Sequence, residues 1–277
     1  MRIAIQGEPG AFSHEATLAL IPEAVIEPCP VSADVFKALT EGSVDAAVIP
    51  IENSLAGSVL EHFDLLLSHD VRVVRESLLR IRHNLIAITG ASMDKLDRVY
   101  SHPVALAQCR RFLSEHPKMR PLAFYDTAGS VKHLVESSDS GAGAIASEAA
   151  AHYYGAEILQ AGIEDNPENY TRFFLVRRTA DTKTDPGANK ISVAFSVENR
   201  PGSLVAALNE LSAMGTNLTK IESRPVHGKP WEYVFYVDCQ LHSAEEGSRA
   251  IEVLKPHCAM VKELGRYREA ERTGRRE

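Results

Sequence analysis

Long hydrophobic runs are missing from this chain of 277 residues. The longest apolar stretches, such as residues 44–51, fall far short of the ~20 residues that a membrane-spanning helix needs. The N-terminus indicates a short strand that turns at Gly7, without the basic start and long apolar core of a signal peptide. We therefore expect a cytoplasmic protein with no membrane partner.

Clustered metal ligands and paired cysteines are also missing. The cysteines Cys29, Cys109, Cys239 and Cys258 lie far apart, and no C-x-x-C pair occurs. This spacing is typical of reduced, buried thiols in a cytosolic protein. The 11 histidines show no H-E-x-x-H motif and no clustered ligand spacing. The sequence therefore predicts no metal and no other cofactor.

A basic excess is absent as well, since the formal net charge is −7. Nucleic-acid-binding proteins usually carry a basic face, so this charge argues against a nucleic-acid partner. It is compatible with a small acidic substrate, because one local arginine can override the global sign. Hydrophobic residues make up 44% and charged residues 24% of the chain, an ordinary globular balance, and the length suits about two domains.

A polar segment at 179–189 contains a Pro-Gly pair, lacks periodicity and divides the chain. After it, alternating apolar residues and leucines at helical spacing predict the order βαββαβ over residues 190–265, a ferredoxin-like unit. Residues 1–180 instead alternate strands with helices, which favours an α/β domain with mainly parallel sheets. Strands are predicted there at 2–6, 24–27, 44–51, 71–75, 84–88, 97–101, 122–125, 143–146 and 172–177.

Polar side chains gather where several of these strands end, at residues 7–14, 50–57, 101–109, 126–130 and 169–176. Ligands of such sheets bind at the carboxyl ends of strands, so these segments are candidate site loops. Each segment also has a purely structural interpretation as a tight turn or a helix cap. No Ser/His/Asp set, Cys/His set or carboxylate pair emerges from spacing. The residues predict a cleft of hydroxyls, amides and one arginine, suited to a small polyanion.

Taken together, these segments resemble the prephenate dehydratase family. Residues 171–173 are similar to its Thr-Arg-Phe signature, and its other motifs occur in the same order at 7–14, 50–57 and 101–109. In the C-terminal module, residues 202–205 resemble the Gly-Ala-Leu-Val motif and residues 222–225 match the Glu-Ser-Arg-Pro motif of an amino-acid-binding ACT domain. This chain departs from the family at two positions, where Val104 replaces Gln and Ser203 replaces Ala.

The resemblance implies that the protein converts prephenate to phenylpyruvate, with loss of water and carbon dioxide. It implies a two-lobed catalytic domain like type II periplasmic binding proteins at 1–180, with the chain crossing between lobes near 77–83 and 170–176. The ACT domain at 190–265 would bind L-phenylalanine as an allosteric inhibitor at interfaces of a homodimer or homotetramer. The alternatives are arogenate dehydratase, or a non-catalytic small-molecule sensor on the same scaffold.

The resemblance also assigns site residues. Thr171 would be the catalytic residue, donating or relaying a proton to the leaving hydroxyl. The implied substrate-binding residues are Glu52, Asn53, Ser54, Ser101, Gln108, Thr127, Ala128, Arg172 and Phe173. The implied phenylalanine-binding residues are Gly202, Ser203, Leu204, Val205, Asn217, Leu218, Glu222 and Ser223.

Two of these assignments leave alternatives open. Arg172 either pairs with a substrate carboxylate or holds the lobes together. Glu52 beside a dianionic substrate would have to be protonated or hydrogen-bonded.

Removal of residues 190–277 is expected to leave turnover and to abolish inhibition by phenylalanine.

Overall fold

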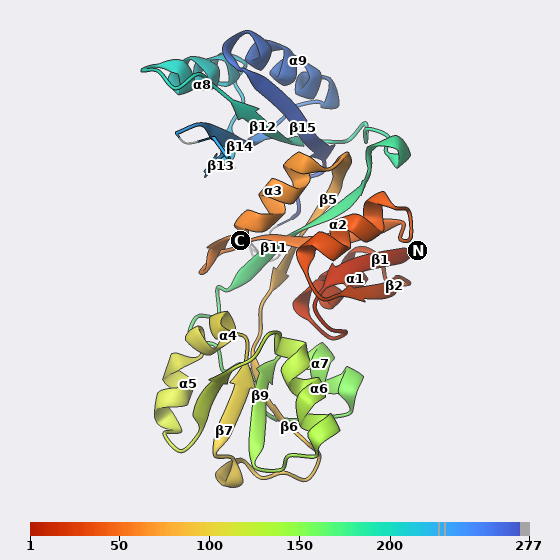
Figure 1. Ribbon diagram of the computed structural model, residues 1–277, viewed down its shortest axis with the longest axis vertical. Coiled ribbons are helices and arrows are strands. Elements are labelled where there is room, and N and C mark those ends of the chain that lie inside the picture. The colour runs from red at the N-terminus through yellow and green to blue at the C-terminus, as the bar shows by residue number, and fades with distance from the viewer. Residues whose placement is uncertain (227, 230, 272–277) are drawn as a thin grey trace.

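The computed structural model describes residues 1–226, 228–229 and 231–271. Figure 1 shows three bodies stacked along the long axis: lobe 1 in the middle, lobe 2 at one end and the C-terminal module at the other. Lobe 1 is built from both ends of the catalytic segment, residues 1–80 and 170–178, and lobe 2 from the residues between them. This arrangement confirms the predicted fold class.

The sheet of lobe 1 has the strand order β2-β1-β3-β11-β5, with the short β4 paired to the end of β3. Its strands are β1 (Arg2–Gln6), β2 (Val25–Cys29), β3 (Ala46–Asn53), β4 (Gly57–Ser58), β5 (Val71–Arg80) and β11 (Tyr170–Arg178). Its helices are α1 (Phe12–Leu20), α2 (Ser32–Thr40) and α3 (Leu60–Ser68). Strand β11 runs antiparallel to both neighbours, so the sheet is mixed and not mainly parallel as predicted.

The sheet of lobe 2 has the strand order β10-β6-β9-β7-β8. Its strands are β6 (Asn84–Ala87), β7 (Arg98–Ser101), β8 (Arg120–Ala123), β9 (Ala142–Ala146) and β10 (Glu157–Gln160). Its helices are η1 (Met93–Lys95), α4 (Pro103–Ala107), α5 (Arg110–Glu115), α6 (Thr127–Ser137) and α7 (Glu148–Tyr154). The chain crosses at 81–83, within the predicted range, but returns at 161–169, because β11 is already paired in lobe 1 from Tyr170 onward.

The C-terminal module has the predicted βαββαβ order, with antiparallel strands in the order β13-β14-β12-β15. Its elements are β12 (Lys190–Ser196), α8 (Ser203–Ala213), β13 (Leu218–Pro225), β14 (Tyr233–Gln240), α9 (Ala244–Leu254), η3 (Lys255–His257) and β15 (Met260–Tyr267). The segment before it contains the short helix η2 (Thr179–Asp181). Residues of alternate parity on these strands pack against α8 and α9, as the period of two predicts.

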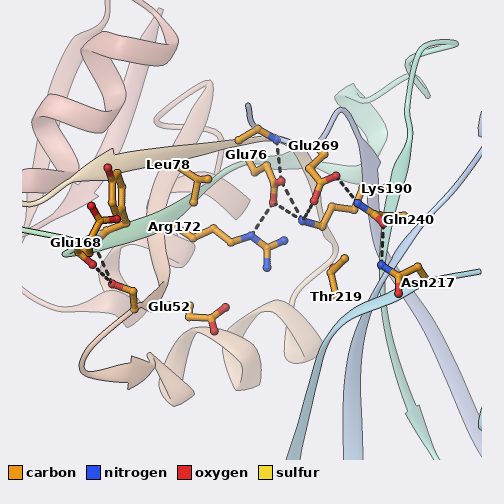
Figure 2. Close-up of a pocket in the computed structure, with 13 residues that line it drawn as sticks. Glu52, Glu76, Leu78, Glu168, Arg172, Lys190, Asn217, Thr219, Gln240 and Glu269 are labelled. Carbon is orange, nitrogen blue, oxygen red and sulfur yellow. Dashed lines mark hydrogen bonds and ion pairs between the residues drawn. The ribbon is translucent and has the colours of Figure 1, made fainter. Parts of the chain in front are cut away.

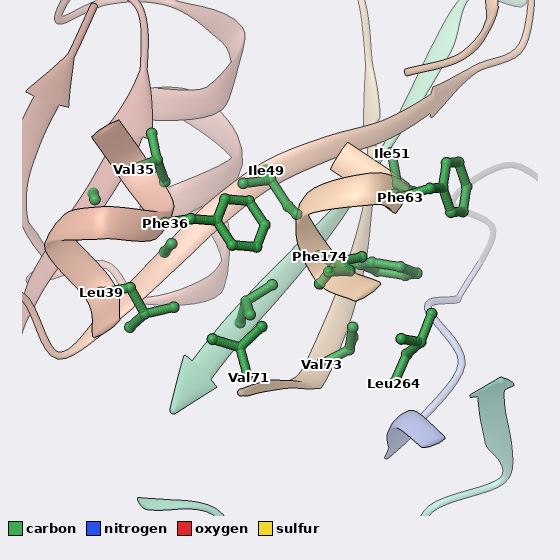
Figure 3. Packing of buried hydrophobic residues seen from close by; sticks show 14 of the residues in the cluster. Val35, Phe36, Leu39, Ile49, Ile51, Phe63, Val71, Val73, Phe174 and Leu264 are labelled. Carbon is green, nitrogen blue, oxygen red and sulfur yellow. The ribbon is translucent and has the colours of Figure 1, made fainter. Parts of the chain in front are cut away.

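The other face of the C-terminal sheet packs on lobe 1 and forms one continuous core with it. Phe63 and Leu66 of α3 and Phe174 of β11 belong to the same buried cluster as Leu264 and Tyr267 of β15 (Figure 3). Strand β15 approaches β5 so closely that a Cβ on Gly265 would lie 2.1 Å from the Val73 carbonyl oxygen. The module is therefore a structural part of lobe 1, and truncation at residue 190 would expose this core.

We predict that Leu264→Ala destabilises the whole protein, because Leu264 is buried between the two units. The expected cost is about 2–5 kcal/mol of unfolding free energy, as for other buried leucines. Urea unfolding followed by fluorescence and by circular dichroism measures it. The control is Val25→Ala at the exposed start of the edge strand β2, which should stay within about 0.5 kcal/mol. Two separate transitions, with only one shifted, would contradict a shared core.

Candidate active site

Asn53 and Thr171 form the centre of the candidate site. They are register partners at the ends of β3 and β11, and the Asn53 Nδ2 donates a hydrogen bond of 2.9 Å to the Thr171 Oγ1. The orientation of the Asn53 amide is fixed, because its Oδ1 accepts from the backbone N–H groups of Leu55 and Ala56 at 3.0 and 2.9 Å. The threonine oxygen therefore accepts a hydrogen bond from Asn53, and among the described residues its own O–H has no acceptor and is free to donate.

Three further side chains join this pair to lobe 2. The Gln108 Nε2, at the end of α4, donates to the Asn53 Oδ1 at 3.3 Å. The Gln108 Oε1 accepts from the Asn169 Nδ2 and from the His83 Nε2, each at 2.9 Å. The Asn53 Nδ2 also donates to the Asn169 Oδ1 at 2.8 Å. The result is a neutral hydrogen-bond network located where the chain crosses between the lobes.

His83 and Asn169 were not among the residues predicted from sequence. They lie in the two crossing segments, and both are buried. Since the Gln108 Oε1 can only accept, the His83 proton is on Nε2 and Nδ1 is a lone pair. Within the described part of the chain that Nδ1 has no hydrogen-bond partner. Burial lowers the pKa of His83, which keeps the imidazole neutral. Both residues could have been predicted only from the positions of the two crossing segments between the lobes.

The lobes also meet through the loop after β1, another predicted site segment. Glu8 in this loop accepts hydrogen bonds from the Lys132 Nζ and the Tyr125 hydroxyl, at 3.2 and 3.0 Å. The Ser147 hydroxyl, which caps α7, donates to the Gly10 carbonyl oxygen at 2.5 Å. A Cβ on Gly10 would lie 2.6 Å from the Ala150 Cα, so this approach requires glycine.

Arg172 and Glu52 do not line this site, which corrects two substrate-binding assignments. Residues in a strand alternate between faces, so the neighbours of Thr171 and Asn53 point to the opposite side of the sheet. Glu52 lies 3.2 Å from the Lys220 Nζ of the C-terminal module. Arg172 is buried, and its donors are taken by Glu76, Asp238 and Tyr267. The awkward pairing of Glu52 with a dianionic substrate therefore does not arise.

Phe173 and Ser101 serve the core instead of a ligand in this structure. Phe173 is 1% exposed and packs between β1 and α1 in the core of lobe 1. Ser101 is fully buried, and its hydroxyl donates to the Ile145 carbonyl oxygen at 2.6 Å. The Ser54 hydroxyl bridges the carbonyl of Glu168 and the N–H of Tyr170 at the surface. The polar side chains of both serines are thus used to join strands.

Thr127 and Ala128 are the first residues of α6, whose N-cap is Asp126. The Asp126 Oδ1 accepts from the Gly129 N–H at 2.7 Å, as the cap interpretation predicted. A Cβ on Gly7 would lie 2.6 Å from the Asp126 Oδ2, so the loop after β1 touches this helix start. The segments 7–14 and 126–130 are therefore brought together across the lobes. A helix N-terminus of this kind favours an anionic group.

The predicted regulatory residues lie on two faces of the C-terminal sheet. Gly202 has a positive φ of 87° and precedes α8, where Ser203 and Leu204 are half-buried and Val205 is exposed. Leu218 packs with the core under the helices, and Ser223 shares that face through its register partner Phe235. Glu222 lies on the other face, where its carboxylate accepts from the Ser58 hydroxyl of lobe 1 at 2.6 Å.

Asn217 also lies apart from the residues around α8. Its Nδ2 donates to the Gln240 Oε1 at 2.8 Å, and it lines a cavity between the module and lobe 1. The structure thus separates Asn217 and Glu222 from the other predicted phenylalanine-binding residues within one chain.

No group of three or more His, Cys, Asp or Glu side chains that could hold a metal ion occurs among the described residues. Burial raises the pKa of the Cys109 thiol, which disfavours a reactive thiolate beside Gln108. None of the helices described here is both long enough and apolar enough to span a bilayer. The side chains that the structure brings together around Thr171 are amides and an imidazole.

Comparisons with known proteins agree with the motifs. The sequence model described as prephenate dehydratase matches residues 3–181, and the ACT domain model matches residues 191–246. The chain therefore belongs to the prephenate dehydratase family. It is 39% identical over 280 residues to an arogenate dehydratase/prephenate dehydratase from Arabidopsis thaliana, covering 96% of this chain and 72% of the relative.

Solved structures of the prephenate dehydratase family share the whole architecture. The crystal structure of prephenate dehydratase from Arthrobacter aurescens in complex with L-Phe has a TM-score of 0.88 and 31% identity, covering 97% of this chain and 90% of that one. GqqA, described as a novel type of quorum quenching acylase, also has a TM-score of 0.88, with 34% identity over 97% of this chain and 98% of that one. The catalytic and ACT units are thus arranged here as in these proteins.

Val104, which replaces the family glutamine, does not take part in the network. It is 42% exposed and lines a cavity of about 330 Å³ beside Gln108 and Asn169. The substitution changes the wall of this cavity, and Gln108 still makes the bonds that join the lobes.

We predict that Thr171→Val lowers kcat by about 10²-fold or more, because it removes the one free hydroxyl proton of the network while conserving volume. Thr171→Ser, which keeps the hydroxyl, is the matched control and should retain most of the activity. Steady-state kinetics with each variant measure the effect. Near-normal turnover by the valine variant would remove Thr171 from the mechanism.

We predict that acidification below about pH 6.5 destabilises the protein, in part through His83. The pKa of His83 is lower in the folded state than in the unfolded state. Below the unfolded pKa, the unfolded chain therefore binds a proton at His83 that the folded chain does not bind. Stability is therefore lost as pH falls below the unfolded pKa, by at most about 1.4 kcal/mol per pH unit for this group. His83→Gln should flatten the dependence of urea unfolding on pH, and an unchanged slope would contradict this assignment.

Proposed function

We propose that this protein is a prephenate dehydratase that serves phenylalanine biosynthesis. Prephenate takes up one proton and releases water and carbon dioxide, and phenylpyruvate remains. As the C–C bond to the ring carboxylate breaks, its electron pair enters the ring, and the hydroxyl leaves with the added proton. The new aromatic ring provides the driving force, so the enzyme needs to position the substrate and donate one proton.

The free hydroxyl proton of Thr171 is the observation that carries this proposal. Asn53 donates to the Thr171 oxygen and cannot accept from it, which directs the threonine proton away from the network. The pKa of a threonine hydroxyl is too high for a strong acid. Thr171 therefore acts by holding a proton at the leaving oxygen within a fixed geometry. Gln108 and Asn169 support that geometry from the other lobe.

With Arg172 engaged elsewhere, the substrate carboxylates require another partner. We assign the pyruvyl carboxylate to the N-terminus of α6 at Thr127 and Ala128, which faces the loop after β1. The Asp126 carboxyl group caps this helix, and burial raises its pKa, which favours its neutral form beside a substrate carboxylate. Ser101 has no free donor for this purpose. The neutral amides around Thr171 leave the departing ring carboxylate without a strong counter-charge, which favours its loss as carbon dioxide.

Regulation by L-phenylalanine belongs to the same proposal. The ACT domain match and the similar structure solved with L-Phe support an effector site around the start of α8, at residues 202–205 with Leu218 and Ser223. Val205, Ile221 and Trp231 expose large apolar surfaces on this domain. We propose that these surfaces meet in a cytoplasmic homodimer or homotetramer, in which the effector binds between copies.

The decisive experiment is a turnover assay of the purified protein with prephenate, with and without phenylalanine. We expect phenylpyruvate to form and phenylalanine to reduce its rate. Parallel measurements of kcat/KM with arogenate decide between the two dehydratase substrates. Binding of prephenate without turnover would instead show a non-catalytic sensor and would contradict the proposal.

A further inference from the structure

The two strands that hold the catalytic pair carry a second pair on their opposite face. Asn53 pairs with Thr171 in the β3–β11 register, and the next partners are Glu52 and Arg172. Because strand residues alternate between faces, the first pair points to the cleft and the second to the ACT domain. The catalytic hydroxyl and the ACT contact are therefore adjacent residues of one strand.

Arg172 is held by three hydrogen bonds, one from each of its guanidinium nitrogens. Figure 2 shows the bond to Glu76. Its Nε donates to the Glu76 Oε2 of β5 at 2.6 Å, and its Nη1 donates to the Asp238 Oδ2 of β14 at 2.5 Å. Its Nη2 donates to the Tyr267 hydroxyl of β15 at 2.9 Å. Two of the three partners thus belong to the ACT domain.

These ACT partners form a closed ring of hydrogen bonds with Arg172. Tyr267 accepts from Arg172, so its own proton goes to Ser192, whose hydroxyl lies 2.5 Å away. Ser192 in turn donates to the Asp238 Oδ1 at 2.5 Å. All four side chains are less than 10% exposed. Each donor in the ring has one defined acceptor, so a displacement of the ACT strands is transmitted to the guanidinium.

The charges of the cluster are balanced across the domain boundary. The Lys190 Nζ of the ACT strand β12 lies 3.1 Å from the Glu76 Oε1 and 3.1 Å from the Glu269 Oε1. Among the buried side chains, Arg172 and Lys190 thus oppose Glu76 and Asp238, and Glu269 adds a partly exposed carboxylate. Removing one member leaves an uncompensated buried charge, which is strongly unfavourable. Separation of the cations from the carboxylates of this cluster is therefore unfavourable.

Strand β11 has an irregularity next to the residue that the cluster holds. Its pairing with β3 shifts register between Arg172 and Phe173, whereas its pairing with β5 is continuous over the same residues. A cavity of about 920 Å³ borders the same segment, between Tyr170 and Arg172 on one side and Lys190 and Asn217 on the other. The end of β11 therefore has a register shift on its β3 side and a cavity beside it.

We propose that Arg172 is a positioning residue, held by Asp238 and Tyr267, through which the ACT domain sets the position of Thr171. Binding of an amino acid to the ACT domain shifts β14 and β15, and Arg172 transmits this shift to its neighbour in β11. The signal passes through the buried face of the ACT sheet and bypasses the linker at 179–189. This inference rests on the proposed dehydratase function for its kinetic readout.

The test compares Asp238→Asn and Tyr267→Phe with a control at another contact between the same domains. The control is Asp64→Asn, which removes the ion pair of 2.5 Å between Asp64 and Arg224. That pair is partly exposed and lies on α3, outside the cluster around Arg172. Circular dichroism melts confirm that each full-length variant is folded, and Tyr267→Phe removes only one oxygen.

The readouts are kcat, KM for prephenate and the phenylalanine concentration that gives half-inhibition. We expect both cluster variants to change the half-inhibition concentration by roughly fivefold or more, within the usual range of allosteric coupling. kcat should fall while KM changes little, and Asp64→Asn should match the wild type. A merely structural role would reduce the folded fraction without changing the half-inhibition concentration of the enzyme that remains.

Two results would overturn the proposal. One is wild-type response to phenylalanine in both cluster variants. The other is an equal change in Asp64→Asn, which would show that coupling is spread over the whole interface. If the wild type does not turn over prephenate, the proposed function has failed. In that case the coupling through Arg172 is tested by the amide hydrogen exchange rates of residues 170–173. Phenylalanine should change these rates in the wild type and not in the cluster variants.

Discussion

The buried contact between Arg172 and Asp238 joins the strand that carries Thr171 to the ACT sheet. Desolvating such ions costs several kcal/mol each, and the cost is offset only while every partner is in place. Glu76 of β5 and Tyr267 of β15 accept the other two hydrogen bonds of Arg172. The relative position of the two domains therefore depends on a cluster that tolerates little separation. The shared core of Phe174 and Leu264 adds an apolar contact beside it.

The same alternation of side chains explains why the surroundings of Thr171 are uncharged. Glu52 and Arg172 turn to the ACT side, and Asn53 and Thr171 remain in the site. A carboxylate beside Thr171 would repel the ring carboxylate of the substrate, and a strong cation there would stabilise the carboxylate that has to leave. Amides, a hydroxyl and a neutral imidazole avoid both effects while holding the reacting groups in place. This composition suits a reaction whose driving force comes from formation of an aromatic ring.

The ACT domain of this protein contacts the catalytic domain with residues of its own motifs. Glu222 of the Glu-Ser-Arg-Pro motif accepts from Ser58, whereas Ser223 belongs to the face covered by helices. One strand, β13, thus exposes the effector face on one side and contacts lobe 1 on the other. An effector bound near α8 is separated from lobe 1 only by the thickness of the sheet. A linker-mediated signal is not required by this geometry.

Local sequence patterns were sufficient to predict many secondary-structure elements of this protein and its family. Alternation such as Ile191, Val193 and Phe195 predicted the strands of the ACT domain, and the motif that includes Thr171 indicated the family. The sequence could not assign Glu52, Arg172 and Phe173 to faces, because a bulge and two neighbouring strands decide which side each one meets. His83 stood outside every candidate segment, and Asn169 began one without being assigned a role, since only the two crossings between the lobes bring them to Gln108. The residue types and their order determined the fold and the family. The tertiary structure alone decided which of those residues meet, because Asn53 lies 118 residues before Thr171 and Tyr267 lies 95 residues after Arg172.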